Sequence, residues 1–253
     1  MSKRLEVENA AKRFGGLLVF DDVTFHAPTG QITALIGPNG AGKTTLINMI
    51  CGALRPDRGG MRKDGRVLDG LRPSDALRLG LVRTFQEVRA FSTLTALENV
   101  LVALPRQPGD RLLGLLGWRW RSAERAARAT ALELLAQLGL DRDAAQPAAS
   151  LPFGSQKLLG LARAAATGAD TLLLDEPTSG LELQRVPIVT GFLRSLRQEG
   201  RTILLIEHNV DVVAELADHV VVLQGTVIAS GAPDRVLRDR RVIDEYLGRL
   251  YDA

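Results

Sequence analysis

The amino-acid sequence predicts an α/β fold with an N-terminal antiparallel β subdomain and an inserted α-helical subdomain. Near the N-terminus, β-rich segments are separated by turn residues. Toward the C-terminus, short apolar strands alternate with helical segments, which is typical of parallel strands joined by crossover helices. Between these regions the pattern is helical and rich in Ala, Leu and Arg. We therefore expect one domain, 1–253, with an α/β core at 1–87 and 168–253 and a helical subdomain at 88–167.

Each expected element follows from its local residue pattern. Asp64-Gly65 is a favoured pair for a tight turn, so the residues around it predict a β-hairpin. Before the insert, strands are expected at 5–14, 17–27, 31–37 and 79–86, a helix at 41–54 and the hairpin at 59–68. After it, strands are expected at 171–177, 201–208 and 219–231, with helices at 186–198 and 211–218.

Composition and charge indicate a globular protein of ordinary type. Apolar residues make up 45% of the chain, which is enough for one large core or two modest ones. The net charge of +3 comes from basic residues spread along the chain, so no block typical of nucleic-acid binding stands out. The basic residues fit a solvated surface or, as a second reading, contact with anionic lipid or a partner. We expect no nucleic-acid partner.

No segment reads as a membrane span or a secretory signal. The longest nearly uncharged run, residues 33–54, contains a proline, several glycines and Lys43, which makes it a poor span. The N-terminus has no apolar core. Cys51, the single cysteine, is expected to be a buried, inert thiol, and its isolation fits a reducing compartment. Any link to a membrane is therefore expected to go through a partner.

Residues 111–120 combine leucines and two tryptophans with flanking arginines. One reading is a loop or short helix packed on the insert. The other is an exposed apolar patch that meets a membrane-bound partner or the lipid interface.

The sequence GPNGAGKT contains a phosphate-binding loop between an expected strand and an expected helix. Small residues allow the backbone N–H groups to face phosphate oxygens, and the start of the following helix adds positive potential. Lys43 is expected to reach the β- and γ-phosphates, and the Thr44 hydroxyl can bind Mg²⁺. This motif predicts a P-loop NTPase core. The expected nucleotide-binding residues are Gly37, Pro38, Asn39, Gly40, Ala41, Gly42, Lys43, Thr44 and Thr45.

Two carboxylates follow an apolar strand in TLLLDEP. Asp175 would lie at the carboxyl end of that strand, where open α/β sheets bind ligands, and could hold Mg²⁺. Glu176 could polarise the attacking water beside a γ-phosphate. The alternative for both is a pair of solvated acids at a strand end.

Two further polar residues come after predicted strands. His208 follows the next strand in sequence, so it could reach the same sheet edge and contact a γ-phosphate oxygen; a capping or surface role is the alternative. Gln86 ends LVRTFQ, and its carbonyl could bind Mg²⁺ while its backbone acts as a hinge to the insert.

These residues in this order resemble the nucleotide-binding subunit of ATP-binding cassette (ABC) transporters. The resemblance covers nearly the whole chain and includes GPNGAGKT, Gln86, LPFGSQ, LLLDEP, SGLE and His208. Small GTPases and RecA-like ATPases lack the signature helix, which LPFGSQ would begin here, and the switch histidine, which would be His208. This chain also has no N-K-x-D motif, which reads guanine. Phrases such as RFGGLLVF, LVRTFQEVRAF and IEHNVDVV look most like the ATPases of branched-chain amino acid importers.

The resemblance implies that LPFGSQ begins the signature helix, whose N-terminus faces the γ-phosphate held by a second subunit. Pro152, Phe153, Gly154 and Ser155 are then ATP contacts. The pattern departs from the usual L-S-G-G-Q, because Pro152 replaces the serine that normally meets the γ-phosphate and Ser155 replaces the glutamine. The backbone N–H groups and the helix dipole remain, so a weaker but working contact is expected. In the loop that follows TLLLDEP, Glu182 stands where Asp is common in this family.

The resemblance also implies a stacking aromatic for adenine, for which Phe14 is the candidate; simple core packing is the alternative. ATP and Mg²⁺ are the expected cofactors, with Glu176, His208 and Gln86 as catalytic residues and Thr44, Gln86 and Asp175 at the metal. The expected partners are a second ABC ATPase, identical or a paralogue, and integral membrane permeases. Residues 87–99 of this chain would contact a loop of the permeases. The expected place is the cytoplasmic face of the inner membrane. A soluble ABC ATPase not linked to transport and a non-hydrolysing regulatory module are the alternatives.

Overall fold

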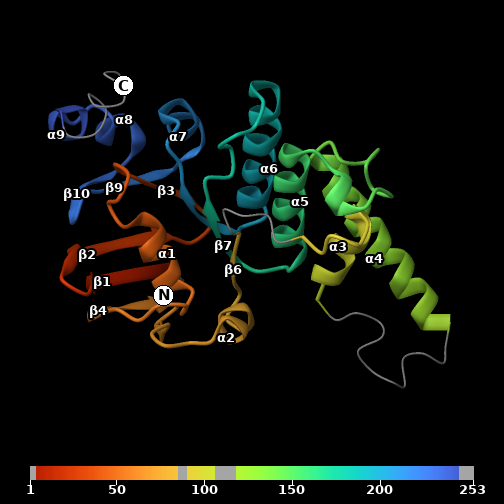
Figure 1. The fold of residues 1–253 in the computed structure, drawn as a ribbon, viewed down its shortest axis with the longest axis horizontal. Coiled ribbons are helices and arrows are strands. Elements are labelled where there is room, and N and C mark those ends of the chain that lie inside the picture. Colours follow the sequence, from red (N-terminus) through yellow and green to blue (C-terminus); the bar gives the residue numbers. More distant parts are fainter. Residues whose placement is uncertain (1–3, 85–89, 106–117, 245–253) are drawn as a thin grey trace. The chain divides into compact units, whose positions relative to one another are not determined.

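The computed structural model describes residues 4–84, 90–105 and 118–244 of the chain. Its contacts divide the chain into two compact units. The first unit contains Met1–Arg83, Asp170–Ser179 and Arg194–Ala253, and the second contains Thr84–Ala169 and Gly180–Leu193. Figure 1 shows both units as ribbons.

The first unit begins with a four-stranded antiparallel sheet in the order β2-β1-β4-β5. The predicted hairpin around Asp64-Gly65 is confirmed, because both residues have positive φ and connect β4 with β5. The strands of this sheet are β1 (Arg4–Phe14), β2 (Leu17–Pro28), β4 (Arg58–Lys63) and β5 (Arg66–Val67).

A six-stranded sheet in the order β10-β9-β3-β8-β7-β6 forms the rest of the first unit's framework. All neighbouring strands are parallel except β9 and β10, so the expected parallel arrangement is confirmed for the core. The strands β3, β7 and β8 are buried at every position, which explains their nearly continuous apolar sequences. The strands are β3 (Ile32–Ile36), β6 (Leu81–Arg83), β7 (Thr171–Asp175), β8 (Thr202–Ile206), β9 (His219–Leu223) and β10 (Val227–Gly231).

Helix α1 (Lys43–Ile50) belongs to a hydrophobic cluster that includes residues of both sheets. Leu46 and Ile47 of the helix are fully buried in this cluster with Phe20 of β2 and Leu204 of β8. This packing fixes the helix against the end of β3, which positions the loop between them. The remaining helices of the unit are α2 (Pro73–Arg78), α7 (Val210–Leu216), α8 (Pro233–Val236) and α9 (Arg240–Val242).

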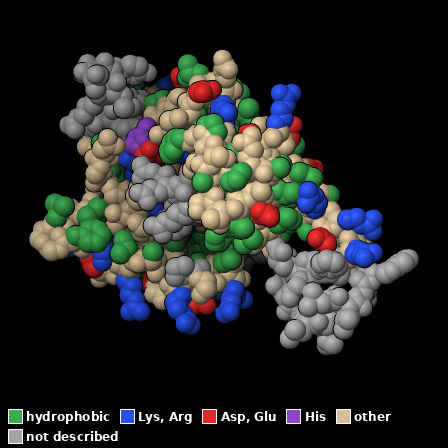
Figure 2. Space-filling model, turned by 45° about the vertical axis from the view of Figure 1, so that its right-hand side comes forward, with side chains coloured by type: hydrophobic (Ala, Val, Ile, Leu, Met, Phe, Trp, Pro, Cys, Tyr) green, Lys and Arg blue, Asp and Glu red, His purple; other side chains and the backbone are tan. Residues whose placement is uncertain are grey.

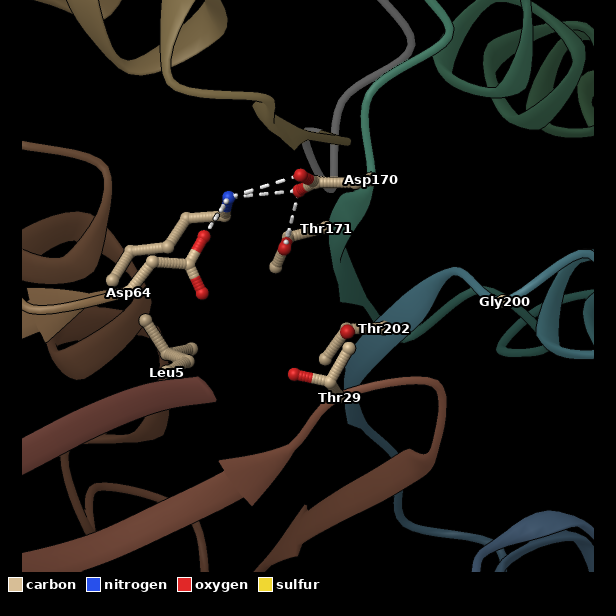
Figure 3. A pocket seen from close by; sticks show the side chains of 8 residues that line it. Leu5, Thr29, Asp64, Asp170, Thr171, Gly200 and Thr202 are labelled. Carbon is tan, nitrogen blue, oxygen red and sulfur yellow. Dashed lines mark hydrogen bonds and ion pairs between the residues drawn. The ribbon is translucent and has the colours of Figure 1, made fainter. Parts of the chain in front are cut away.

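The same unit has a polar pocket at the start of β7, shown in Figure 3. Lys63 has only 6% of its side chain exposed, and its Nζ pairs with Asp170 Oδ1 at 2.9 Å and with Asp64 Oδ2 at 3.2 Å. The pocket holds about 150 Å³ and is also lined by Thr171 and Thr202. These ion pairs connect the end of β4 with the segment that begins β7.

The second unit is helical, as the sequence predicts for the insert. Helix α3 begins with a capping box, in which Thr95 and Glu98 each bond the other's backbone N–H. Asn99 is fully buried, and its amide donates to the carbonyls of Phe91 and Thr95 at 3.0 Å each. The helices are α3 (Ala96–Ala103), α4 (Trp118–Gln137), α5 (Phe153–Ala166) and the first part of α6 (Val186–Gln198), with 3₁₀ turns at Ala148–Ser150 and Leu183–Arg185.

Two expected elements differ from the structure, and one helix was not expected. The segment 219–231 was expected to be one strand, but it forms β9 and β10, because Gly225 at φ 72° turns the chain back. Helix α1 ends at Ile50, since Gly52 at φ 75° follows its C-cap Cys51. Helix α2 was not expected, because its six residues are too few to show a helical period.

Candidate functional site

The phosphate-binding loop connects β3 with α1 in the first unit. Its glycines are needed for their backbone geometry: Gly37, Gly40 and Gly42 have φ values of 150°, 81° and 91°. A Cβ on Gly37 would lie 2.0 Å from the carbonyl oxygen of Leu223, and one on Gly42 would lie 2.5 Å from Cδ1 of Phe20. Only glycine therefore fits at these two positions of the loop.

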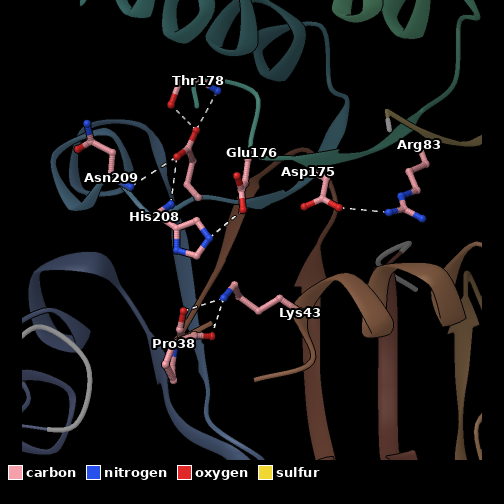
Figure 4. Close-up of polar contacts among 10 residues, drawn as sticks. Pro38, Lys43, Arg83, Asp175, Glu176, Thr178, His208 and Asn209 are labelled. Atoms are coloured by element: carbon pink, nitrogen blue, oxygen red, sulfur yellow. Dashed lines mark hydrogen bonds and ion pairs between the residues drawn. The ribbon is translucent and has the colours of Figure 1, made fainter. Parts of the chain in front are cut away.

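Lys43 bends back over this loop. Its Nζ donates to the carbonyl oxygens of Gly37 at 2.7 Å and Pro38 at 2.9 Å, and the residue is buried (Figure 4). Burial lowers the pKa of the Lys43 ammonium below its usual value, while the charges of Glu176 and Asp175 act in the opposite direction. A lysine held inside a glycine-rich loop, near two carboxylates, is a cation that an incoming phosphate group can attract.

The other loop residues vary in exposure. Asn39, Gly40 and Thr44 are exposed, and Ala41 is buried. Pro38 and Thr45 are half-buried. The Thr44 hydroxyl is thus accessible to a ligand.

Asp175 and Glu176 lie at the carboxyl end of β7, as expected from the sequence. Asp175 is 3% exposed, and its Oδ2 accepts a hydrogen bond from Arg83 Nη2 at 3.1 Å. Glu176 has φ of 50°, a left-handed conformation that is uncommon for a residue with a side chain. Such strained positions cluster at functional sites, where the surrounding structure holds them in place.

His208 and Glu176 are brought together by the parallel pairing of β7 and β8. Asp175 is in register with Ile206, so the residues that follow the two strands lie side by side. His208 Nε2 lies 2.9 Å from Glu176 Oε1, and Figure 4 shows the imidazole facing this carboxylate. The two side chains are therefore a hydrogen-bonded pair on the same sheet edge as the phosphate loop.

Glu207 is a residue of this site that sequence reasoning missed. It is 2% exposed, and its Oε1 accepts hydrogen bonds from both the backbone N–H and the hydroxyl of Thr178. Its Oε2 accepts the backbone N–H of His208 at 3.1 Å. The buried carboxylate thus joins the loop after Glu176 to the loop that carries His208. The signal in the sequence that could have identified Glu207 was an acidic residue between the apolar strand and His208.

The residues at this edge fit a magnesium ion. Asp175 supplies a buried carboxylate and Thr44 an accessible hydroxyl, and both are hard oxygen donors of the kind that Mg²⁺ prefers. In the described part of the chain, no group of three or more His, Cys, Asp or Glu side chains could hold a metal. Mg²⁺ is typically bound through one or two carboxylates together with substrate phosphates, so one carboxylate and one hydroxyl are compatible with it.

Phe14, the candidate for adenine stacking, lies at the end of β1 and is 48% exposed. This exposure rules out simple core packing. Lys12 Nζ lies 5.6 Å from the centroid of its ring.

The start of α5 lies in the second unit. Pro152 precedes the helix as its N-cap, and no side chain of the described residues caps it. Phe153 is 60% exposed, whereas Ser155 is 1% exposed and its hydroxyl accepts a hydrogen bond from Arg185 Nη1 at 3.0 Å. A Cβ on Gly154 would meet Leu181 Cδ2 at 3.4 Å. The helix start therefore presents backbone N–H groups beside an exposed aromatic ring.

Several expected residues give less information. Gln86 and most of the Leu/Trp segment at 111–120 lie outside the described residues. Cys51 is half-buried, and burial raises the pKa of its thiol to about 12, which agrees with an inert cysteine.

Comparison with known proteins identifies the family. The family model described as ABC transporter matches residues 20–179, which include the phosphate loop, the start of α5 and the carboxylates at the end of β7. The chain belongs to the ABC transporter family.

Relatives cover nearly the whole chain of this ABC protein. It is 40% identical to the high-affinity branched-chain amino acid transport ATP-binding protein BraF of Pseudomonas aeruginosa, over 96% of this chain and 97% of that protein. It is 39% identical to LivG of Escherichia coli strain K12, which has the same description, over the same shares of the two chains.

Solved structures confirm the ABC ATPase fold. A nucleotide-free ATP-binding cassette from an ABC transporter matches with a TM-score of 0.81 and 32% identity, over 96% of this chain and 98% of that one. The ADP conformation of the ATP-binding cassette MJ1267 also matches with a TM-score of 0.81 and 32% identity, over 98% and 100%.

The described helices and one face of the surface show two further features. Among the described residues, no helix of this ABC protein has the length and apolar character needed to cross a bilayer. On the face drawn in Figure 2, Lys and Arg side chains lie at separate places and do not merge into one basic patch. This distribution follows the spread of basic residues along the sequence.

Proposed function

We propose that this chain is the ATP-binding and ATP-hydrolysing subunit that powers an ABC importer for branched-chain amino acids or a related small polar solute. The observation that carries the proposal is the convergence of Lys43, Asp175, Glu176 and His208 at the carboxyl ends of β3, β7 and β8. The solute class is supported by the names of BraF and LivG.

ATP binds to the phosphate loop, residues 37–45, through backbone N–H groups and Lys43, and its adenine stacks on the exposed ring of Phe14. Entry of the phosphates exchanges the Lys43 contacts with Gly37 and Pro38 carbonyls for charge-assisted contacts with phosphate oxygens. Thr44, Asp175 and Gln86 would hold Mg²⁺, and the bound metal would neutralise phosphate charge. The helical subdomain of this ATPase consists of residues 88–167.

Hydrolysis depends on Glu176 and His208. The Glu176 carboxylate accepts a proton from the attacking water, and a general base of this kind contributes about 10²–10⁴-fold to rate. The contact of 2.9 Å between His208 Nε2 and Glu176 Oε1 keeps the carboxylate in place. The same ring can turn its N–H toward a γ-phosphate oxygen and so respond to an intact triphosphate.

A second ATPase subunit completes each site. The start of α5 has no capping side chain among the described residues and no acidic side chain in its first turn, so its backbone N–H groups can attract an anion. It supplies neither the lysine nor the base. Those groups come from the phosphate loop of a partner cassette, identical or a paralogue. Integral membrane permeases contact the region of residues 87–99, at the cytoplasmic face of the inner membrane.

The Glu176→Gln variant tests the catalytic proposal. We expect ATP turnover by the chain purified with its partners to fall at least about 100-fold, because the amide cannot accept the proton. ATP binding should persist, since the phosphate loop is unchanged. Glu199→Gln, on an exposed side chain paired with Arg201, is the matched control. Turnover near the wild-type rate would remove Glu176 as the base.

Co-purification tests the coupling to transport. We expect the full chain to be recovered with a multi-span membrane protein from mild detergent extracts. Recovery only as a soluble protein, with full ATPase activity, would instead support a soluble ABC ATPase.

A further inference from the structure

The carboxylate proposed to hold Mg²⁺ already has a buried cation beside it. Arg83 ends β6, the edge strand that pairs with β7. Its Nη2 lies 3.1 Å from Asp175 Oδ2, with 10% of the arginine side chain and 1% of the aspartate side chain exposed. Figure 4 shows the other carboxylate oxygen of Asp175 pointing away from Arg83. One oxygen of the carboxylate is thus held by the chain, and the other faces a different direction.

The second arm of the guanidinium reaches helix α1. Arg83 Nη1 donates a hydrogen bond to the side-chain oxygen of Asn48. Asn48 lies four residues after Thr44, so both lie on the same face of α1, one turn apart. Arg83 therefore connects the helix that carries one proposed metal ligand with the strand that carries the other. A planar guanidinium can make both bonds at once, whereas an ammonium group cannot match this fork geometry.

We propose that Arg83 is a positioning residue for the Mg²⁺ site, which it serves by neutralising and orienting Asp175 while the metal is absent. The inference rests on the proposed function, because it assumes that Asp175 binds the metal. A buried carboxylate without a cation is strongly destabilised. In the metal-free chain Arg83 lies in direct contact with Asp175, while the charge of Lys43 also acts on this carboxylate. Once Mg²⁺ binds, the metal supplies positive charge at the same carboxylate, and stability depends less on Arg83.

This role predicts a specific dependence on the metal. In Arg83→Met, Asp175 loses the guanidinium that contacts it in the nucleotide-free chain, and ATP without Mg²⁺ adds further negative charge nearby. Mg²⁺ then offsets a larger excess of negative charge near Asp175 than it does in the wild type. The stability gained from MgATP relative to ATP with EDTA should therefore increase. An arginine that only packs or only cross-links would lower stability by the same amount in all conditions.

The experiment is thermal unfolding of the full chain without nucleotide, with ATP and EDTA, and with MgATP. For Arg83→Met we expect a melting temperature lower by roughly 6–15 °C without nucleotide. The gain from MgATP over ATP with EDTA should exceed the wild-type gain by at least about 4 °C. Arg83→Lys keeps the positive charge and loses the two-armed hydrogen bonding of the guanidinium. Its melting temperature and its metal-dependent gain should lie between those of the wild type and Arg83→Met. Arg58→Met, which removes an exposed ion pair with Asp21, should match the wild type.

The outcomes separate the inference from the proposed function. An unchanged or smaller metal-dependent gain in Arg83→Met overturns the inference. If that variant does not fold, Arg83→Lys decides, with an enlarged gain expected and an unchanged one overturning it. Asp175→Asn should abolish the metal-dependent gain. If the gain survives in Asp175→Asn, or if ATP does not stabilise the wild type at all, the proposed metal or nucleotide site is itself wrong and the inference falls with it.

Discussion

The phosphate-loop region of the first unit and the start of α5 in the second unit differ in how their polar groups are satisfied. Lys43 donates to the loop carbonyls, Asp175 is paired with Arg83, and Glu176 contacts His208, so these side chains have partners within the chain. The start of α5 has no capping side chain among the described residues and no acidic residue in its first turn. The two regions therefore differ in whether side chains of the chain itself satisfy their polar groups.

Placing a negative charge at the start of α5 is the strongest test of this difference. Phe153→Glu should stabilise helix α5 slightly, because a negative charge in the first turn is attracted by the positive end of the helix dipole. The same charge should repel a γ-phosphate and lower ATP turnover in the assembled protein at least about tenfold. Turnover and melting temperature are measured together, with Ala129→Glu on the exposed side of α4 as the control. Unchanged turnover would show that this helix start does not face an anion.

Removing the buried acid of the first region tests whether its pairing matters. Glu207→Ala should lower the free energy of unfolding by about 1–3 kcal/mol, because it leaves the hydroxyl and N–H of Thr178 and the N–H of His208 without their buried acceptor. Turnover should fall while the ATP dissociation constant stays close to the wild-type value, since the phosphate loop is untouched.

Chemical denaturation, nucleotide titration and turnover measure the three quantities. Glu207→Gln keeps an oxygen acceptor and should recover much of the loss. An effect confined to stability would contradict a positioning role for Glu207 at His208.

Restoring the usual hydroxyl at α5 should have a smaller effect. Pro152→Ser places a side chain that can cap the helix at its N-cap position, which stabilises helices by about 0.5–2 kcal/mol. The hydroxyl also adds one contact for a phosphate, so turnover should rise a few-fold. Turnover is compared with Pro152→Ala, which removes the ring and adds no hydroxyl. A serine variant no faster than the alanine variant would show that Pro152 does not limit the reaction.

The smallest expected effect lies outside both regions and provides a baseline for pH experiments. Burial, followed by the charge of nearby His26, lowers the pKa of His219 below its ordinary 6.5. The unfolded state then binds more protons as pH falls below 6.5, so stability should be full above this pH and decrease below it. His219→Asn should flatten that part of the profile, as measured by urea unfolding at about pH 5.5 and 7.5. An identical slope in the variant would assign the dependence to other groups.

Periodicity and turn residues predict most elements of the fold correctly, because local geometry determines them. The hairpin at Asp64-Gly65, the loop between β3 and α1, and the buried strands β7 and β8 are examples. The exposure of Phe14 could not be read from its residue type, since a strand-end aromatic is compatible with a core or a surface position. Helix α2 was too short to detect, and the turn between β9 and β10, at Gly225, was read as part of one strand.

The sequence by itself determined the phosphate loop and the acids after β7, because each depends on residues that are neighbours in the chain. Only the tertiary structure decided the pairs that hold those groups: Arg83 with Asp175 and Asn48, and Glu207 with Thr178. These partners are brought together by the parallel order β8-β7-β6 and by the packing of α1. Hydrogen bonds and ion pairs depend on distances of a few ångströms, and the spacing of residues along a chain does not specify such distances between separate elements.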